Sequence, residues 1–261
     1  MPGNVRIERR GDVGVLVLDH IERRNALTVE MWEVIPPLAA ELAGDDDVRV
    51  VVVRGAGEVA FASGADISEF ETTRSSAALN RSYDQLVAEA TGAISAIPKP
   101  VIAAVHGFCL GGGLALALAC DLRIVADDAS FAIPAARLGV GYNAPGVRTL
   151  LQLVGPSATK RILYTAARLP APEAARLGLV DEVHPKGGLD DAVAALAETM
   201  SANAPLTLAA VKVAVRELQR DPGSRQLDDV SAAITACFDS DDFAEGVRAF
   251  MEKRPPRFTG R

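Results

Sequence analysis

The chain alternates between short apolar runs and longer amphipathic segments over its first 126 residues. Short runs rich in Val, Ile, Leu and Ala predict buried strands, because side chains covered on both faces of a sheet need not alternate with polar ones. We expect strands at 13–19, 48–53, 101–105 and 121–126, with another at 179–183. Helices are expected at 29–43, 80–97 and 111–120. The first should be capped by Thr28 and interrupted at Pro36 and Pro37, because proline removes a donor and clashes with the preceding turn.

From position 189 onward the pattern becomes mostly helical. The expected helices span 189–202, 205–220, 225–238 and 241–252. An α/β part followed by a helical part favours an α/β layer fold with a helical appendage. We therefore divide the chain into a core at 1–200 and a helical region at 201–261, although no Pro-, Gly- or Ser-rich linker separates them.

Composition and charge narrow the class of protein. Of the 261 residues 49% are hydrophobic and 23% are charged, which excludes a disordered chain and a disulfide scaffold. The net charge of −7 disfavours nucleic acid and anionic membranes as partners. Three scattered Cys, a polar segment at 1–10 and apolar runs shorter than about 18 residues predict a cytoplasmic protein without a membrane span. Three His without spaced partners predict no metal site.

Two glycine-containing turns follow predicted strands. The first, FASGADISEF at 61–70, contains Gly64 and Ala65, and its Asp66 and Glu69 have the spacing of a capping box. The second, HGFCLGGG at 106–113, opens a small apolar helix, whose free amides and dipole favour an anion. A strand-to-helix turn and close helix packing are the structural alternatives. No G-x-G-x-x-G or G-x-x-x-x-G-K-[ST] is present, which argues against a dinucleotide enzyme.

Together the two turns predict one site for a negatively charged oxygen atom, which neither turn predicts alone. The backbone amides of Ala65 and Gly112 can grip one developing oxyanion, and each such donor is typically worth about 2.7–4 kcal/mol in a transition state. The pairing of FASGADISEF with HGFCLGGGLALALACDLRIV resembles the crotonase superfamily, also called the enoyl-CoA hydratase/isomerase family. The similarity extends to RNAL at 24–27, FAIPAARLG at 131–139 and DFAEGVRAFMEKRPPRF at 242–258.

The resemblance implies a fold, a ligand and an assembly. The fold is an α/β spiral of ββα turns with a C-terminal helical trimerisation region, assembled as a homotrimer or a dimer of trimers. The substrate is an acyl-CoA, with coenzyme A as part of the substrate and no separate cofactor. In the family the amides matching Ala65 and Gly112 bind the thioester oxygen.

The resemblance also implies residues that contact the substrate. Arg24 and Lys253, beside Arg23 and Arg254, are candidates to bind the phosphates of coenzyme A, and the adenine is expected near backbone at Ala26, Ala62 and Ile67. A solvated basic face is the alternative for either cation pair. The full set of candidate contacts is Arg24, Ala26, Ala62, Asp66, Ile67, Gly111, Pro134 and Lys253.

The sequence departs from the hydratases at both acid–base positions. Hydratases of this superfamily carry one glutamate three residues after the oxyanion glycine and another directly after the matching proline. Those positions are Ala115 and Ala135 here. Hydration needs a base for the water and an acid for the α-carbon, so this loss argues against ordinary hydratase chemistry. It also argues against isomerases that use the second glutamate alone.

Tyr142 is the remaining candidate catalytic group near the expected pocket. Its segment partly resembles the methylmalonyl-CoA decarboxylases, although those tend to carry His where Ala65 stands. Decarboxylation leaves a thioester enolate and needs a proton source rather than a base. The alternative is a packed aromatic whose hydroxyl binds a backbone carbonyl. A bound anion such as bicarbonate, as in the dihydroxynaphthoyl-CoA synthases, or Glu69 and Glu71 from the first turn, could replace the missing acids.

Three functions remain to be compared. The first is an acyl-CoA enzyme that stabilises a thioester enolate, the second an acyl-CoA-binding protein with little catalysis, and the third and weakest a dinucleotide oxidoreductase. We expect His106 to be a hydrogen-bonded packing residue and Cys109 a small buried hydrophobe, because neither has an evident catalytic partner.

Overall fold

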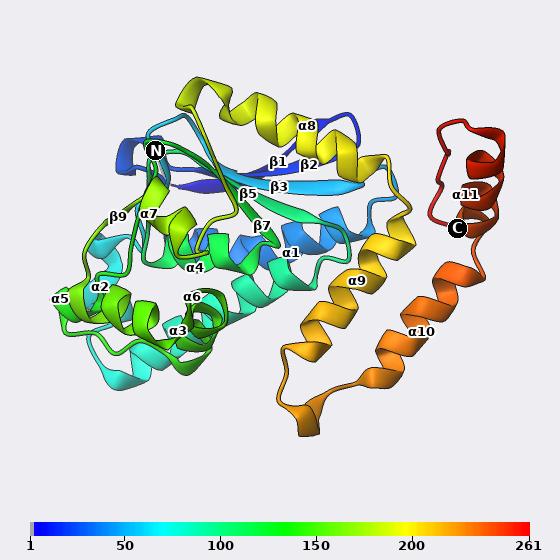
Figure 1. Cartoon of the computed structure of the whole chain (residues 1–261). Helices are drawn as coiled ribbons and strands as arrows, with labels where there is room; N and C mark the ends of the chain where they lie inside the picture. The colour runs from blue at the N-terminus through cyan, green and yellow to red at the C-terminus, as the bar shows by residue number, and fades with distance from the viewer. Residues whose placement is uncertain (1–2) are drawn as a thin grey trace.

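The computed structural model describes residues 3–261, which form two sheets with helices packed around them (Figure 1). The larger sheet has the order β1-β2-β3-β5-β7-β10. Its strands are β1 (Asn4–Arg10), β2 (Val13–Asp19), β3 (Val50–Gly55), β5 (Val101–Val105), β7 (Leu122–Ala126) and β10 (Glu182–His184). β1 and β2 pair antiparallel with Asn4 opposite Asp19, and the strands after β2 pair in parallel.

The smaller sheet is made of short strands that follow strands of the larger one. Its order is β4 (Ala60–Ala62), β6 (Phe108–Leu110), β8 (Ser130–Ala132) and β9 (Leu169–Pro170), and the first three run parallel. β4 follows β3, β6 follows β5 and β8 follows β7, each pair leading into a helix. This repetition confirms the expected spiral of ββα turns.

The helices complete the turns of the spiral and continue beyond it. They are α1 (Val29–Gly44), α2 (Phe70–Thr73), α3 (Ala77–Ala96), α4 (Gly112–Ala119), α5 (Ala135–Leu138), α6 (Ala144–Thr165), α7 (Ala171–Arg176), α8 (Leu189–Ser201), α9 (Pro205–Leu218), α10 (Leu227–Phe238) and α11 (Asp241–Glu252). Short 3-10 turns lie at η1 (Ile21–Arg23), η2 (Ile67–Glu69), η3 (Lys186–Gly188) and η4 (Pro222–Ser224). No helix within residues 3–261 has the length and apolarity needed to cross a bilayer.

The larger sheet separates two apolar layers. Its inner face packs against α1, α3 and α4, where the single Trp of the chain, Trp32, is fully buried. Its outer face is covered by α8, whose Leu189, Val193 and Ala197 pack on valines of β2 and β3. Coverage on both faces explains why the parallel strands read as continuous apolar runs. Figure 1 shows α8 and α1 on opposite sides of the sheet.

The expected break in the first helix is wrong. α1 begins after Thr28, whose hydroxyl accepts a hydrogen bond from the Met31 amide at 3.2 Å as expected, but it continues through Pro36 and Pro37 to Gly44. The prolines remove two helical donors, yet Ile35 and Ala39 on either side of them are buried against the core. Packing of this face therefore outweighs the local preference to end the helix.

Other differences lie at element boundaries and in short elements. The strand expected at 179–183 is displaced to β10, at 182–184. The sequence does not predict β1, because its charged residues outnumber the alternating apolar residues Val5 and Ile7. Positions 1 and 2 of that polar segment lie outside the described residues. α6 was not expected either, and it bends where Gly155 has a φ of 72° before Pro156.

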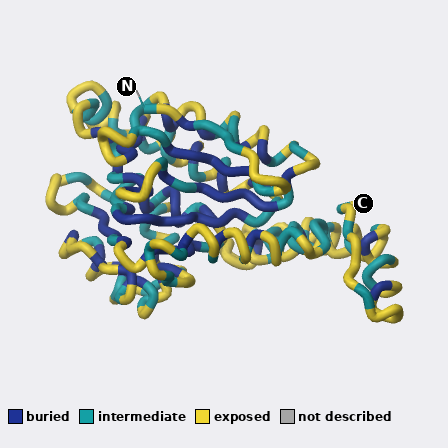
Figure 2. The backbone as a smooth tube through the Cα atoms, turned by 90° about the horizontal axis from the view of Figure 1, so that it is seen from above, coloured by how far each residue is buried: buried dark blue, intermediate teal, exposed yellow. Residues whose placement is uncertain are grey.

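The C-terminal helices lie beside the spiral rather than around it. α9 and α10 form an antiparallel pair that extends away from the sheets, and α11 follows beyond α10 (Figures 1 and 2). The tail returns to the body, where the Arg49 guanidinium donates to the Phe258 carbonyl at 2.8 Å. Many apolar side chains of this region are exposed in the single chain, including Val211, Val215, Ile234, Phe238 and Phe250.

Candidate active site

A cavity of about 570 Å³ lies where the two glycine turns meet α3, α4 and the start of α6. Its walls are mostly apolar, with side chains such as Val87, Leu118, Ile133 and Leu138. Both Ala65 and Gly112 lie on its lining, as do the expected residues Ile67, Gly111 and Pro134. The spiral therefore brings together segments that are far apart in the sequence, from Ala65 to Pro134.

The amides of Ala65 and Gly112 converge at one side of the cavity. A Cβ atom placed on Gly112 would lie 3.8 Å from the Ala65 nitrogen, so the two turns nearly touch. Neither amide donates a hydrogen bond to any group in residues 3–261. Two adjacent unpaired N–H groups are the arrangement that binds an oxygen atom bearing negative charge.

Neighbouring backbone hydrogen bonds fix both turns. The Leu27 amide donates to the Gly64 carbonyl at 2.8 Å, and the Asp66 amide donates back to the Leu27 carbonyl at 2.9 Å. In the second turn the Gly111 amide donates to the Ala132 carbonyl at 2.8 Å. These hydrogen bonds involve the neighbouring backbone amides, and the amides of Ala65 and Gly112 stay free to bind a ligand. The two N–H groups are thus held in place before any ligand arrives.

The positions of the missing glutamates face the same cavity. Ala115 and Ala135 both lie on its lining, where they present methyl groups. Asp84 on α3 is the only acidic side chain among the lining residues of the described chain, and it accepts a hydrogen bond from the Asn80 amide at 3.0 Å. Asp121 is occupied elsewhere, because its carboxylate accepts from the Val101 amide and from Lys212, both at 2.7 Å.

Glu69 caps the start of α1 and does not line the cavity. Its carboxylate accepts a hydrogen bond from the Val29 amide at 2.9 Å. The expected capping box is therefore half right. Asp66 does accept from the Ser68 amide at 2.9 Å, but Glu69 caps a different helix. Burial raises the pKa of Asp66, but the hydrogen bonds from Ser68 and the nearby positive charges together lower it by more, so the net pKa lies below the usual value. Glu71 is exposed and does not line the cavity.

Tyr142 lines the cavity from the loop before α6. Its ring lies against Gly146, where an added Cβ would be 2.7 Å from the ring carbon Cε1. Burial raises the pKa of Tyr142 to about 12, so its hydroxyl keeps its proton at neutral pH. No backbone carbonyl of residues 3–261 accepts a hydrogen bond from this hydroxyl, contrary to the structural alternative.

Of the other residues expected to contact the substrate, some lie near the first turn and one lies far from the cavity. Ala26 and Ala62 are buried beside the first turn, and Ile67 is 67% exposed at its rim. Arg24 has a positive φ of 54° and lies over the ring of Phe108, with its Cζ 5.2 Å from the ring centroid. Lys253 directly follows α11, and α11 lies on the opposite side of the molecule from α2 and α5 (Figure 1). Lys253 is not on the cavity lining of this chain.

Arg168 joins Arg24 at Phe108 from the other direction. Its Cζ lies 5.0 Å from the same ring centroid, so two cations share one aromatic ring close to the first turn. No local motif surrounds Arg168, and only the pairing of β8 with β9 brings it there. Sequence reasoning missed it for that reason.

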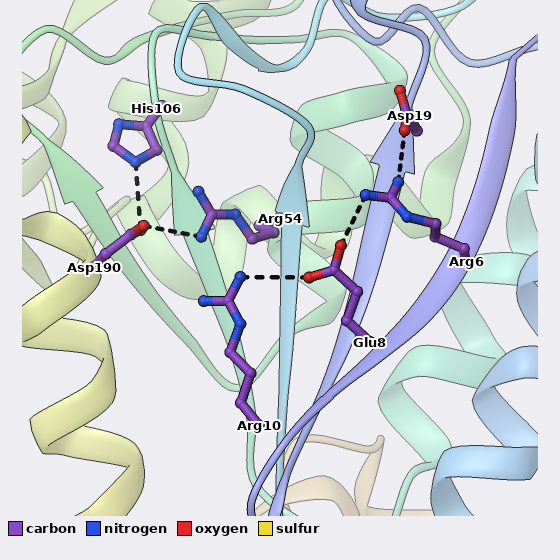
Figure 3. Close-up of polar contacts among 7 residues, drawn as sticks. All are labelled: Arg6, Glu8, Arg10, Asp19, Arg54, His106 and Asp190. Carbon is purple, nitrogen blue, oxygen red and sulfur yellow. Dashed lines mark hydrogen bonds and ion pairs between the residues drawn. The ribbon is translucent and has the colours of Figure 1, made fainter.

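His106 and Cys109 lie outside the cavity lining. Both are buried, as expected, and burial raises the pKa of the Cys109 thiol well above its usual value, which makes it a poor nucleophile. The expected hydrogen bonds of His106 are absent within residues 3–261. Its Nε2 lies 3.6 Å from Asp190, which pairs with Arg54 on the sheet face covered by α8 (Figure 3).

A second group missed from the sequence lies behind Gly112. The indole nitrogen of Trp32 donates to the Tyr83 hydroxyl at 2.8 Å, and Trp32 Cζ2 would be 3.0 Å from a Cβ on Gly112. Arg74 lies over the Tyr83 ring and lines the cavity. These residues come from α1, α3 and the end of α2, and no spacing in the sequence links them. No cluster of three or more metal-ligating side chains occurs within the part of the chain that the structure describes.

Comparison with known proteins agrees with this fold. The family model for enoyl-CoA hydratase/isomerase matches residues 8–261. The chain is 33% identical over 251 residues to a short-chain-enoyl-CoA hydratase of Clostridium acetobutylicum, covering 96% of this chain and 95% of the relative. It is 34% identical over 255 residues to a crotonyl-CoA hydratase of Syntrophomonas wolfei, covering 98% and 97%.

A solved structure matches over the same length. The enoyl-CoA hydratase of Bacillus anthracis has a TM-score of 0.91 at 30% identity, covering 99% of this chain and all of the other. An α/β spiral with two apposed glycine turns defines the class of crotonase-fold proteins. The chain belongs to the enoyl-CoA hydratase/isomerase family of the crotonase superfamily.

Proposed function

We propose that this protein is an acyl-CoA enzyme that stabilises a thioester enolate with the amides of Ala65 and Gly112. The convergence of these two unpaired N–H groups on one cavity supports the proposal most directly. When an acyl-CoA loses a group from its α-carbon, negative charge moves to the thioester oxygen. Two fixed donors lower the energy of that charge without any reorganisation during the reaction.

The alanines at positions 115 and 135 favour a reaction that needs no carboxylate acid or base. Ala115 and Ala135 leave no carboxylate at the positions where the hydratases hold their acid and base. A reaction that forms the enolate without a strong base therefore fits this cavity better than hydration does. The relatives are named as hydratases, but this cavity has no carboxylate at positions 115 and 135. Membership of the family therefore does not identify the reaction.

Decarboxylation is the second candidate, and Tyr142 favours it. In that reaction the bond between the α-carbon and a carboxylate breaks, its electron pair forms the enolate, and carbon dioxide leaves. A proton is then added to the α-carbon. Tyr142 lines the cavity and is protonated at neutral pH, so its hydroxyl can supply or relay that proton. Apolar walls also destabilise an unpaired carboxylate before it leaves.

Binding without turnover is the third candidate. A protein that keeps the two amides but lacks both acids would hold an acyl-CoA and release it unchanged. Arg24, close to the first turn, is the candidate within one chain for the phosphates of coenzyme A. Lys253 would act from a neighbouring copy in a homotrimer or a dimer of trimers, and we propose a cytoplasmic location for that assembly.

The first test follows conversion of crotonyl-CoA and methylmalonyl-CoA by mass spectrometry, with and without bicarbonate. Hydration of crotonyl-CoA would show that water activation survives without carboxylates at positions 115 and 135. Formation of propionyl-CoA from methylmalonyl-CoA would support decarboxylation. If neither ester is consumed, calorimetry measures whether they bind. Binding would leave another acyl-CoA substrate or a binding protein with little catalysis, and no binding would contradict the proposal.

A matched pair of variants tests the amide itself. Gly112 is the first residue of α4, where proline is tolerated, so Gly112→Pro deletes the N–H and leaves the helix able to form. Gly112→Ala keeps the N–H and introduces a similar Cβ contact with Trp32. We expect Gly112→Pro to lower kcat about 100- to 1000-fold relative to Gly112→Ala on whichever ester is consumed. Equal activity of the two variants would contradict the proposal.

A further inference from the structure

Arg74 brings a cation to the wall of an otherwise apolar cavity. It directly follows α2, and its Cζ lies 3.9 Å from the centroid of the Tyr83 ring and 5.1 Å from that of Phe70. Its Nε atom is buried and has no hydrogen-bond partner within residues 3–261. No carboxylate of the described chain forms an ion pair with it. Aromatic faces attract the guanidinium but leave its N–H donors available.

A buried arginine in the same chain shows the usual arrangement. Arg123 pairs with Asp181 at 2.7 Å and donates to the Leu179 carbonyl at 2.9 Å. Burial of a charge is costly without such partners. Arg74 is half-buried, and its buried Nε atom has no partner within residues 3–261, so an anionic ligand that enters the cavity would supply the partner that these residues do not.

The apolar walls of the cavity indicate that the rest of the ligand is a hydrocarbon segment. The charged side chains on its lining are Arg74 and Asp84, and Asp84 holds the Asn80 amide rather than Arg74. The remaining walls include Val87, Leu118 and Leu138. A ligand with a hydrocarbon segment and one anionic group matches this combination of surfaces.

Contacts lead from the oxyanion turn to Arg74 through two aromatic side chains. Trp32 lies against Gly112, the Trp32 indole donates to the Tyr83 hydroxyl, and Arg74 covers the Tyr83 ring. The guanidinium is therefore set apart from the amides that would bind the thioester oxygen. An anion at Arg74 belongs to the distal part of the acyl group rather than to its α-carbon.

We propose that the acyl group of the substrate carries a carboxylate at the end remote from the thioester, and that Arg74 binds it. The inference rests on the proposed acyl-CoA function and adds a substrate class, the CoA esters of dicarboxylic acids. Arg74 acts as a specificity-determining residue, because its guanidinium can form a bidentate pair with a carboxylate. A phosphate of coenzyme A is the other anion that could reach it, and the test separates the two.

The test compares matched CoA esters by calorimetry. Succinyl-, glutaryl- and adipyl-CoA are titrated beside butyryl-, pentanoyl- and hexanoyl-CoA, so that each pair differs only in the terminal carboxylate. We expect at least one acid ester to bind about tenfold or more tightly than its neutral partner, because hydrogen bonds to charged groups are worth that much. Trp32, the single Trp, lies between Gly112 and the Tyr83 hydroxyl, and its fluorescence provides an independent readout of binding.

Three variants identify the group responsible. Arg74→Met should lower affinity for the preferred acid ester about tenfold or more and leave its neutral partner within about twofold. Arg74→Lys should restore part of the preference, because it keeps the charge without the planar fork. Arg81→Met removes a cation from an exposed position on α3 outside the cavity and should change neither ester.

Each other outcome overturns the inference in a recognisable way. If Arg74→Met weakens acid and neutral esters equally, Arg74 binds a phosphate of coenzyme A. If the wild type binds both kinds of ester equally, no distal carboxylate is recognised, and the proposed acyl-CoA function still stands. If no ester binds at all, the proposed function fails together with the inference.

Discussion

Gly113 illustrates at the scale of one residue how closely the chain approaches itself around the candidate site. A Cβ on Gly113 would lie 2.5 Å from the Ala62 carbonyl oxygen, so no side chain fits there. The same need explains Gly64, whose φ is 108° and whose Cβ would meet the Leu110 carbonyl at 3.2 Å. Glycine thus allows two backbone turns to come within reach of one oxygen atom.

Tyr142 gives a prediction about alkaline pH at this scale. Burial raises its pKa to about 12 in the folded chain, against an ordinary value of about 10. The folded state therefore disfavours loss of the proton. The resulting contribution to stability is fully present below pH 10 and is lost as the pH rises from about 10 to about 12.

We expect Tyr142→Phe to lose less stability than the wild type across that interval. Urea unfolding at several pH values between 8 and 12 measures the difference, and the tyrosinate absorbance of the folded protein should lose a component that titrates near pH 12. Identical pH profiles of stability for the two proteins would contradict the expected burial of the phenol. A fall in turnover at neutral pH in the same variant would assign Tyr142 a part in the reaction.

At the scale of elements, the start of α1 joins two segments of the site. Thr28 and Glu69 both accept hydrogen bonds from the first turn of α1, at the Met31 and Val29 amides. Glu69 belongs to η2, which directly follows the first glycine turn. A carboxylate at a helix N-terminus is favoured by the helix dipole. The cap therefore holds the segment with Ala65 against the helix with Trp32.

We expect Glu69→Ala to destabilise the protein by about 1 kcal/mol, as the loss of a helix cap usually does. Glu71→Ala is the matched control, because Glu71 is exposed two residues away and no hydrogen bond of its side chain occurs within residues 3–261; it should change stability by less than about 0.5 kcal/mol. Urea unfolding measures both. If Glu69 were instead a catalytic base, Glu69→Gln would abolish a limb of the pH–rate profile, and an unchanged profile is the expected result.

At the scale of the whole molecule, the helical region exposes several large apolar side chains. Phe250 is 83% exposed, and Val211, Ile234 and Phe238 expose large parts of their side chains. We expect these side chains to be covered by other copies of the chain, because large exposed apolar patches are uncommon on a monomer. The extension of α9 and α10 away from the sheets leaves this surface open to other copies of the chain (Figure 2).

We expect light scattering to give three or six times the chain mass of 27.3 kDa. Phe250→Asp should shift the protein toward smaller species, because it places a charge in the proposed interface. Val59→Asp adds a charge at a 59% exposed site in the loop between β3 and β4, and it should leave the mass unchanged. A wild type that elutes as a monomer at micromolar concentration would refute the homotrimer.

The sequence alone determined the elements that depend on local pattern. The apolar runs predicted four strands of the larger sheet, β2, β3, β5 and β7, and the helical pattern predicted α8 to α11 close to their observed bounds. The two glycine turns, each following a predicted strand, also predicted that the amides of Ala65 and Gly112 lie close together, and their binding of a thioester oxygen stays a prediction. The absence of glutamate at positions 115 and 135 was visible without coordinates.

Tertiary structure alone decided what depends on contacts between distant segments. Packing of Ile35 and Ala39 carried α1 through its two prolines, and strand pairing brought Arg168 to Phe108. Arg74 belongs to no motif, and its place on the cavity wall follows from the meeting of α2 with Tyr83 on α3. A sequence pattern records the preference of each segment, whereas burial and charge at a site arise only when several segments share one space.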